Sequence, residues 1–343
     1  MAIFMIGTQR SGSNLLRLML NQLPDIAAPH PPHILDRMMP VEELYGDLSS
    51  SINFHDLVDD ICKLVEFNPV SWDGVMLDRD NIAERARTRN VMGVYEAVHD
   101  AMAEAWGAKE WCCKSLVNIQ YLPQIETHFE NAKYIYLYRD GRDVALSFKK
   151  AVVGEKHFYH IAKEWDFTQK LALAMEPNLP KERFFRISYE DLVSQPKHSM
   201  QRLCKFIGVN YLDSMMNFHE SSEAQRAAES SSLWDQVAQP INADNTSKFL
   251  AEASAAEIRI FEAVAGDVLT TLGYPLHADV DARRVRLGRD EISFFDRENA
   301  RLKAEVQQGM DKADQKRRDR QAALIRTIIS KRLPANGPAT RIQ

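Results

Sequence analysis

The sequence has neither a long hydrophobic run nor an excess of positive charge. No apolar stretch approaches the length of a transmembrane helix, and residues 1–7 lack the basic segment that begins a signal peptide, so we expect neither feature. The formal net charge is −5, so we expect no nucleic-acid partner, and any anion site must be local. With 343 residues, 45% of them hydrophobic, the chain can bury a large core.

Cysteine is also scarce. The chain has four cysteines, Cys62, Cys112, Cys113 and Cys204. They form no C-x-x-C pair and have no zinc-site spacing, so they predict reduced thiols and a cytoplasmic protein. His157 and His160 lie three positions apart without an evident third ligand, so we expect no metal site.

The sequence does contain an alternation of apolar strands and amphipathic helices. The run 2–6 is continuously apolar, and 134–138 is rich in aromatic and β-branched residues, so both predict buried strands. Leucine and methionine at helical spacing predict a helix over 14–23. Further strands are expected at 111–114 and 183–188, and a further helix at 251–272. This order predicts an α/β fold with a central parallel β-sheet.

Two regions interrupt or follow this alternation. Residues 40–107 are interpreted as a helical insertion that covers a site, with an apolar lid formed by Phe54, Phe67, Trp72 and Trp106. The last block, 290–333, is helical and is interrupted at Gly309.

The last helical block carries two further patterns. A short heptad stripe offers a homodimer contact; it consists of Ile292, Phe295, Asn299, Leu302 and Val306. From 311 to 332 basic residues dominate. A solvated helix face is the simpler interpretation of this stretch, and contact with a partner or with an anionic membrane surface is the alternative.

The most informative segment is the loop between the first strand and the first helix. It reads Gly7-Thr8-Gln9-Arg10-Ser11-Gly12-Ser13-Asn14. Its two glycines permit a tight turn, and the N–H groups of the following helix can bind phosphate or sulfate. The loop has the glycine spacing of the motif G-x-x-x-x-G-K-[ST], but Ser13 replaces the lysine and Asn14 replaces the residue whose hydroxyl binds magnesium. A metal-dependent nucleoside triphosphatase is therefore disfavoured.

A second segment suggests a second anion site. Arg139 follows the strand at 134–138, and Ser147 lies on the helix after it. Parallel α/β sheets bind ligands at the carboxyl ends of their strands. An arginine and a hydroxyl at that edge can bind a second phosphate group.

Together these segments resemble the sulfotransferases that use 3′-phosphoadenosine 5′-phosphosulfate (PAPS), in their bacterial and tyrosylprotein-like form. Residues 10–14 resemble the family's 5′-phosphosulfate loop, and 138–147 resemble its 3′-phosphate motif. Residues 113–115 resemble the strand end that carries a lysine, 187–192 the Tyr-Glu-Asp-Leu element, and 245–249 a late Ser-Lys element that closes over PAPS.

The resemblance implies a three-layer, P-loop NTPase-like fold. It covers residues 1–275 as a PAPS-binding domain, with the insertion at 40–107 on the acceptor side, and leaves 280–343 as a helical tail outside it. PAPS is implied as the sulfuryl donor, without a metal. The residues implied to bind it are Thr8, Gln9, Arg10, Ser11, Gly12, Ser13, Asn14, Arg139, Ser147, Tyr189, Ser247 and Lys248.

The resemblance also implies catalytic roles. Arg10 and Lys114 would neutralise the charge that develops on the leaving group. A general base would accept the proton of a hydroxyl or, less favourably, amine acceptor on a small molecule, lipid or glycan. The position of the family's usual histidine is Leu116 here, so the candidates are two histidines in the 28–33 segment, His33 and, close behind it, His30. The alternatives are a nucleotide kinase-like phosphotransferase and a non-catalytic protein that binds PAPS or another anion.

Overall fold

The computed structural model describes residues 1–279 and 287–333, and its centre is one parallel sheet. Five strands pair in the order β2-β3-β1-β4-β5. Because all the pairs are parallel, the carboxyl ends of the strands meet at one edge, where ligands bind in open α/β sheets. The strands are β1 (Ala2–Gly7), β2 (Ile26–Ala27), β3 (Glu110–Cys113), β4 (Lys133–Tyr138) and β5 (Phe184–Ser188).

Helices surround the sheet. The α-helices are α1 (Ser13–Leu20), α2 (Ile34–Met38), α3 (Ser51–Glu66), α4 (Arg79–Arg85), α5 (Val91–Ala105), α6 (Leu122–His128), α7 (Gly141–Lys150), α8 (Phe158–Met175), α9 (Tyr189–Ser194), α10 (Pro196–Ile207), α11 (Ser222–Ser230), α12 (Phe249–Glu252), α13 (Ala255–Thr271), α15 (Arg289–Gln308) and α16 (Lys312–Arg332). Short 3₁₀ helices are η1 (Met39–Tyr45), η2 (Leu116–Tyr121), η3 (Glu176–Asn178), η4 (Asp213–Glu220) and η5 (Ser232–Ala238).

Strand β1 divides the core into two clusters. Successive side chains of a strand point to opposite faces of its sheet. Phe4 and Ile6 therefore pack with residues of α2, α3, α5, α8 and α13, whereas Ile3 and Met5 pack with residues of α1 and α10. Every residue of β1 is buried, as expected for a strand covered on both faces. This arrangement confirms the predicted three-layer α/β fold.

The four predicted strands are present, with ends that agree within one residue. Strand β2 was not predicted because two residues carry no recognisable pattern. The helix expected over 251–272 is two helices, α12 and α13. They are separated at Ala253 and Ser254, where Ser254 forms a capping box with Glu257 that begins α13.

The tail is two helices, as the interruption at Gly309 predicts. Helix α15 packs on the start of α8, where the Phe295 ring stacks on His157 with centroids 4.5 Å apart. Asn299 of the same helix accepts hydrogen bonds from the backbone N–H groups of Lys156 and His157. Part of the heptad stripe is thus used within the chain, and a homodimer contact through it stays a prediction.

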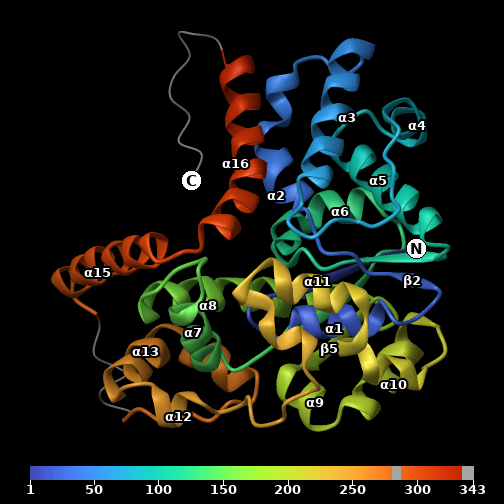
Figure 1. Cartoon of the computed structure of the whole chain (residues 1–343). Helices are drawn as coiled ribbons and strands as arrows, with labels where there is room; N and C mark the ends of the chain where they lie inside the picture. The colour runs from blue at the N-terminus through green and yellow to red at the C-terminus, as the bar shows by residue number, and fades with distance from the viewer. Residues whose placement is uncertain (280–286, 334–343) are drawn as a thin grey trace.

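Helix α16 lies alongside α3 (Figure 1). The interpretation of its basic stretch as a solvated face is wrong for several arginines. Arg317 donates to the Ser230 carbonyl, and Arg332 pairs with Asp56 on α3. The Arg320 guanidinium lies 4.5 Å from the ring centroid of Phe67. Within 1–279 and 287–333, no helix is long and apolar enough to cross a membrane.

Candidate active site

The loop between β1 and α1 is shaped by its two glycines. Gly7 has φ 135°, and a Cβ there would lie 2.1 Å from the Leu137 carbonyl oxygen of β4. Gly12, which precedes the first turn of α1, has φ 86°, and a Cβ there would meet the Tyr189 ring at 2.4 Å. Glycine is therefore required at both positions, so that β4 and Tyr189 can close on the loop.

The two predicted anion motifs meet in space. Arg10 Nε donates a hydrogen bond to Ser147 Oγ over 2.9 Å. Arg139 donates to the carbonyl of Arg10 over 3.1 Å and to the carbonyl of Asn245 over 2.7 Å. Its guanidinium lies 4.4 Å from the ring centroid of Tyr189, whose hydroxyl accepts from Asn245 Nδ2 over 2.9 Å. Residues far apart in sequence thus form one cationic cluster.

Three residues other than glycine have left-handed backbones in the described part of the chain. They are Arg10 with φ 68°, His33 with φ 58° and Ser247 with φ 55°. Such conformations are uncommon for residues with a Cβ and are concentrated at functional sites. All three are among the predicted site residues, but only Arg10 and His33 line the cavities described below.

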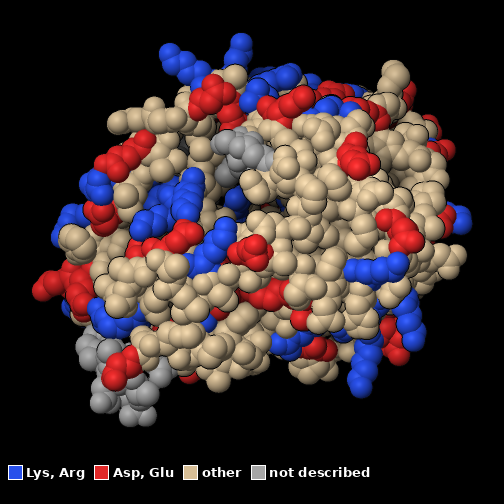
Figure 2. Space-filling view, turned by 60° about the horizontal axis from the view of Figure 1, so that its bottom comes forward, with Lys and Arg blue, Asp and Glu red and all other residues tan. Residues whose placement is uncertain are grey.

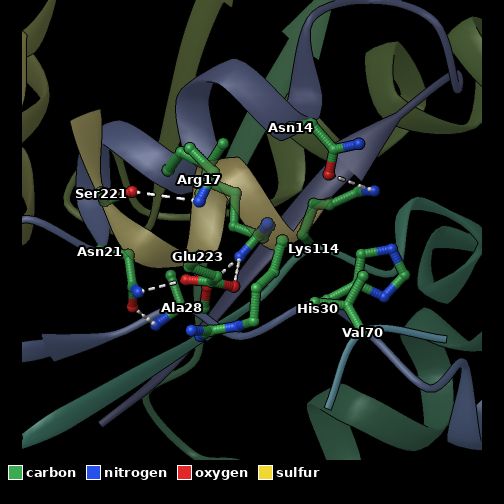
Figure 3. Close-up of polar contacts among 12 residues, drawn as sticks. Asn14, Arg17, Asn21, Ala28, His30, Val70, Lys114, Ser221 and Glu223 are labelled. Atoms are coloured by element: carbon green, nitrogen blue, oxygen red, sulfur yellow. Dashed lines mark hydrogen bonds and ion pairs between the residues drawn. The ribbon is translucent and has the colours of Figure 1, made fainter. Parts of the chain in front are cut away.

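Lys114 stands at the end of β3 and reaches the loop. Its Nζ donates to Asn14 Oδ1 over 3.0 Å (Figure 3). Burial, together with the nearby cations Arg17 and Arg10, lowers the pKa of Lys114 to about 7. An anion beside these cations would favour the protonated ammonium group and raise that pKa.

Behind this cluster lies a buried ion pair. Arg17 of α1 is fully buried, donates to the Ala28 carbonyl over 2.9 Å and pairs with Glu223 of α11 (Figure 3). Asn21 also donates to Glu223, over 2.6 Å, and accepts from the Ala28 N–H over 2.8 Å. The network joins α1, the segment after β2, and α11, so it fixes the backbone that carries the two candidate histidines.

The histidines differ in their surroundings. His30 is 5% exposed and lies beside Lys114 (Figure 3); its carbonyl accepts from Asn68 and Trp72. Its Nδ1 is 3.3 Å from Asn68 Oδ1, and burial lowers its pKa well below the usual value. His33 Nδ1 is 2.9 Å from Ser115 Oγ, and burial with the Lys114 charge lowers the pKa of His33 to about 3.

Two cavities meet at the loop. One is lined by Arg139, Ser147, Tyr189 and Asn245, and we call it the nucleotide cavity. The other has a volume of about 510 Å³ and is lined by the two histidines and Lys114; we call it the acceptor cavity. Both cavities are lined by Arg10, Ser13, Asn14 and Trp234. A group bound at the loop is therefore accessible from both sides.

Most of the predicted loop residues are at this junction. Thr8 and Gln9 line the acceptor cavity, and Gly12 lines the nucleotide cavity. Thr8 Oγ1 accepts a hydrogen bond from Gln169 Nε2 over 2.5 Å. The side chain of Ser11, in the middle of the loop, is fully buried.

Other predicted residues are not brought to the site. Ser247 and Lys248 are exposed and line neither cavity. The predicted apolar lid is also wrong: among the described residues, neither cavity is lined by any of Phe54, Phe67, Trp72 and Trp106. Phe54 is buried in the core, and Trp72 Nε1 donates a hydrogen bond to the His30 carbonyl.

Sequence reasoning missed several residues that line the cavities. Asn245 begins the late element at 245–249, and its position shortly before the Ser-Lys pair is the one sequence signal that points to it. Trp234, which lies edge-on to His30 with centroids 4.6 Å apart, carries no local signal. The missed acceptor-cavity residues include Asp36, Asn68, Glu164, Arg318 and Gln321.

The site can now be compared with known proteins. A sequence model described as "Sulfotransferase family" matches residues 2–213, which is more than half of the chain. The chain belongs to the sulfotransferase family. The match includes the loop, Lys114, the Arg139–Ser147 motif and Tyr189, but it ends before Asn245 and both tail helices.

The relatives compared with this chain are distant in sequence. The protein-tyrosine sulfotransferase of Drosophila melanogaster is 22% identical over 288 residues, which cover 81% of this chain and 52% of that protein. The chain thus spans about half the length of that relative. Protein-tyrosine sulfotransferase A of Caenorhabditis elegans is 23% identical over 290 residues, covering 81% of this chain and 68% of that protein.

Solved structures show the same fold. The sulfotransferase domain from the curacin biosynthetic pathway superposes with a TM-score of 0.56 at 20% identity, covering 80% of this chain and 98% of that one. A TM-score of this size supports the three-layer fold assigned above.

Positive and negative side chains are mixed on the surface of this protein. Figure 2 shows lysine and arginine interspersed with aspartate and glutamate over one face of the molecule. Across 1–279 and 287–333, no three or more His, Cys, Asp and Glu side chains are grouped as they would be around a metal ion.

Proposed function

We propose that this protein transfers a sulfuryl group from PAPS to a hydroxyl group of an acceptor molecule. The observation that carries the proposal is the position of the Arg10 loop between the nucleotide cavity and the acceptor cavity. A donor held at the loop would have its nucleotide on one side and its reacting group on the other. Membership of the sulfotransferase family supports this reading.

Unpartnered polar atoms support an anionic ligand. Ser11 Oγ and Arg139 Nε are buried, and neither has a hydrogen-bond partner among the described residues. A buried donor without a partner costs about 1–3 kcal/mol. A bound anion would relieve that cost. Arg139 and Ser147 fit a 3′-phosphate, whereas the loop and Lys114 fit the 5′-phosphosulfate.

The chemical step is an in-line transfer. The bond between sulfur and the bridging oxygen of the 5′-phosphate breaks, and a bond between sulfur and the acceptor oxygen forms. The bridging oxygen keeps the electron pair and leaves as part of adenosine 3′,5′-bisphosphate (PAP). Arg10 and protonated Lys114 stabilise the negative charge that develops on this oxygen. The acceptor proton passes to a general base.

His33 is the base we favour, with His30 as the alternative. Because Nδ1 of His33 faces Ser115 Oγ, the hydroxyl orients the ring and leaves Nε2 for the proton. The lowered pKa of His33 keeps it neutral, as a base must be, but makes it a weak base. The negative charge of bound PAPS would offset the Lys114 cation and raise that pKa.

Binding of the product nucleotide tests the proposal without knowledge of the acceptor. Calorimetric titration should show PAP binding at least about tenfold tighter than adenosine 5′-monophosphate, because only PAP carries the 3′-phosphate. Tighter binding of ATP with magnesium than of PAP would support a kinase-like phosphotransferase instead. PAP binding without any PAPS turnover on an acceptor panel would support a non-catalytic binding protein.

We also propose a reducing, cytoplasmic setting. All four cysteines are buried as free thiols, which is consistent with it. Fractionation of the native host, with detection by an antibody, tests this location. Recovery of the protein from an oxidising compartment would contradict it.

A further inference from the structure

The acceptor cavity is lined by charged and polar side chains to which the family match gives no role. Besides the loop and the histidines, the lining includes side chains of α2, α8 and the tail helix α16. Helix α16 begins about a hundred residues beyond the matched segment, which ends at residue 213. The cavity wall therefore includes a part of this chain that lies outside the family region.

Two carboxylates face this cavity. Asp36 comes from α2 and Glu164 from α8; both line the cavity and are exposed. Neither carboxylate forms a hydrogen bond or ion pair with another residue of the described chain. Burial by surrounding protein raises the pKa of both. These carboxylates can accept hydrogen bonds from a ligand.

A third cavity group points to a ligand independently. His30 is 95% buried, lines the cavity, and its Nε2 has no hydrogen-bond partner among the described residues. Buried polar atoms are almost always paired. An unpaired ring nitrogen and two carboxylates in the lining of one cavity indicate a ligand that brings several polar hydrogens and oxygens of its own.

Helix α16 supplies a cation that is held in place. Arg318 Nε donates to Asp314 over 2.9 Å, and its Nη2 donates to Ser231 Oγ over 3.0 Å. Its guanidinium lies 5.5 Å from the ring centroid of Trp234, the residue that lines both cavities. Arg318 is thus oriented by its own helix and by the wall of the nucleotide cavity.

The second α16 residue in the wall is also fixed. Gln321 is 3% exposed, and its Nε2 donates to the Leu64 carbonyl of α3 over 2.8 Å. Side-chain hydrogen bonds of Arg318 and Gln321 therefore hold this turn of α16 to Ser231 and to α3. A wall held this firmly suits recognition of a defined small molecule.

The charges of the wall select among ligand classes. Carboxylates accept hydrogen bonds from hydroxyl or ammonium groups, but Arg37, Arg318 and Lys114 also line the cavity and disfavour an ammonium ion. A hydroxyl group can donate to a carboxylate and accept from a guanidinium. A volume of about 510 Å³ is within the range of small-molecule sites.

We propose that the acceptor is a polyhydroxylated small molecule, of the sugar or cyclitol class, held between Glu164 of α8 and Arg318 of the tail helix α16. This inference rests on the proposed sulfuryl transfer. Glu164 accepts hydrogen bonds from acceptor hydroxyls, and Arg318 donates to acceptor oxygens. The bound acceptor thereby places one hydroxyl group next to His33 and the loop.

The test compares acceptor probes and matched variants of the full chain. Transfer of ³⁵S from PAPS is measured with methyl β-D-glucopyranoside, myo-inositol, 4-nitrophenol and N-acetyl-L-tyrosinamide. Glu164→Gln and Arg318→Gln each remove one charge of the wall. Asp166→Asn on α8 and Arg320→Gln on α16 are the controls, because Asp166 pairs with Lys170 and Arg320 faces the groove between α3 and α16.

We expect a polyol to be the best substrate, with kcat/KM at least about tenfold above either phenol. Glu164→Gln and Arg318→Gln should raise the KM of that polyol about tenfold or more, as expected for lost hydrogen bonds to charged groups. The KM of PAPS should stay within about twofold, and both controls should match wild type. A merely structural role would change the KM of both substrates together.

Other outcomes overturn the inference. Preference for 4-nitrophenol or the tyrosine amide contradicts the acceptor class, as does a polyol KM that neither wall variant changes. If none of the four probes is sulfated while PAP still binds, the inferred acceptor class is wrong. PAPS turnover on the wider acceptor panel then decides between the proposed sulfuryl transfer and a non-catalytic binding protein. If PAP does not bind, the proposed function itself has failed.

Discussion

Arg10 and Ser147 are 137 positions apart, yet Arg10 Nε donates directly to Ser147 Oγ over 2.9 Å. This hydrogen bond joins the loop that would hold the 5′-phosphosulfate to the helix that would hold the 3′-phosphate. The residues proposed to bind the two ends of the nucleotide are therefore connected by a hydrogen bond. A substitution in one of the two motifs should also alter binding at the other.

The first prediction concerns this connection. Arg139→Ala and Ser147→Ala should both weaken PAP binding, and the arginine should cause the larger loss. Hydrogen bonds to charged groups contribute roughly 1.5–3 kcal/mol, or about 10- to 150-fold in affinity. Calorimetric titration with PAP measures the effect. Wild-type affinity in both variants would show that the second motif does not bind the 3′-phosphate.

The second prediction concerns metal. Because Asn14 stands where a magnesium-binding hydroxyl is expected and accepts from Lys114, transfer should continue in excess EDTA. The rate of PAP formation from PAPS, with and without EDTA, is the measurement. Loss of turnover that magnesium restores would favour a phosphotransferase.

The third prediction concerns pH. The pKa of Lys114 is lowered to about 7, and the proposed role requires its protonated form. Since kcat/KM reports the free enzyme, it should fall as pH rises above about 7. The lowered pKa of His33, about 3, leaves that ring neutral, so His33 should cause no fall between pH 7 and pH 5.

Lys114→Arg provides the control for the pH profile. Arginine keeps its charge throughout this range, so the fall of kcat/KM on the alkaline side should disappear, even if the absolute rate is lower. An unchanged alkaline limb in Lys114→Arg would assign that limb to another group.

The fourth prediction concerns stability. Glu223→Gln leaves the fully buried Arg17 without its charged partner, and breaking a buried ion pair typically costs about 3–5 kcal/mol. Chemical denaturation should show a clear loss in the free energy of unfolding. Glu229→Gln, an exposed position on the same helix, should change it by less than about 0.5 kcal/mol. Equal stability of the two variants would contradict the role given to the Arg17 network.

The fifth prediction concerns the base. His33→Ala should reduce turnover by about 10²- to 10⁴-fold, the usual contribution of a general base, while PAP affinity barely changes. His30→Ala is the companion variant. If His30→Ala is inactive and His33→Ala is nearly normal, the roles are exchanged. Normal turnover in both single variants and in the double variant would rule out a histidine base.

Local patterns made much of the fold predictable. The strands at 2–6 and 134–138 are fully apolar or aromatic, and the loop after Gly7 has a spacing that few structures other than anion sites require. Lys114 and Arg139 could be named because each directly follows a strand, and Arg10 because it lies in the loop after β1, at the edge where α/β sheets bind ligands. The order of the strands then brings them together.

The acceptor side was less predictable because it depends on contacts between distant segments. Arg318 reaches the cavity only because α16 folds back beside α3, and nothing near Arg318 in sequence indicates this. The aromatic residues of the insertion were expected at the site on composition alone, yet Phe54 packs into the core. In the late element, the carbonyl of Asn245 makes the contact with Arg139, whereas Ser247 and Lys248 are exposed.

The most direct test of the central claim is the joint appearance of two products. The protein is incubated in EDTA with ³⁵S-labelled PAPS and a panel of sugars, cyclitols, alcohols and phenols, and both PAP and labelled acceptor are quantified. The account predicts that PAP and sulfated acceptor form in equal amounts, and that Arg10→Ala and Lys114→Ala suppress both. Absence of labelled acceptor across the panel, with phosphate transferred from ATP instead, would contradict it.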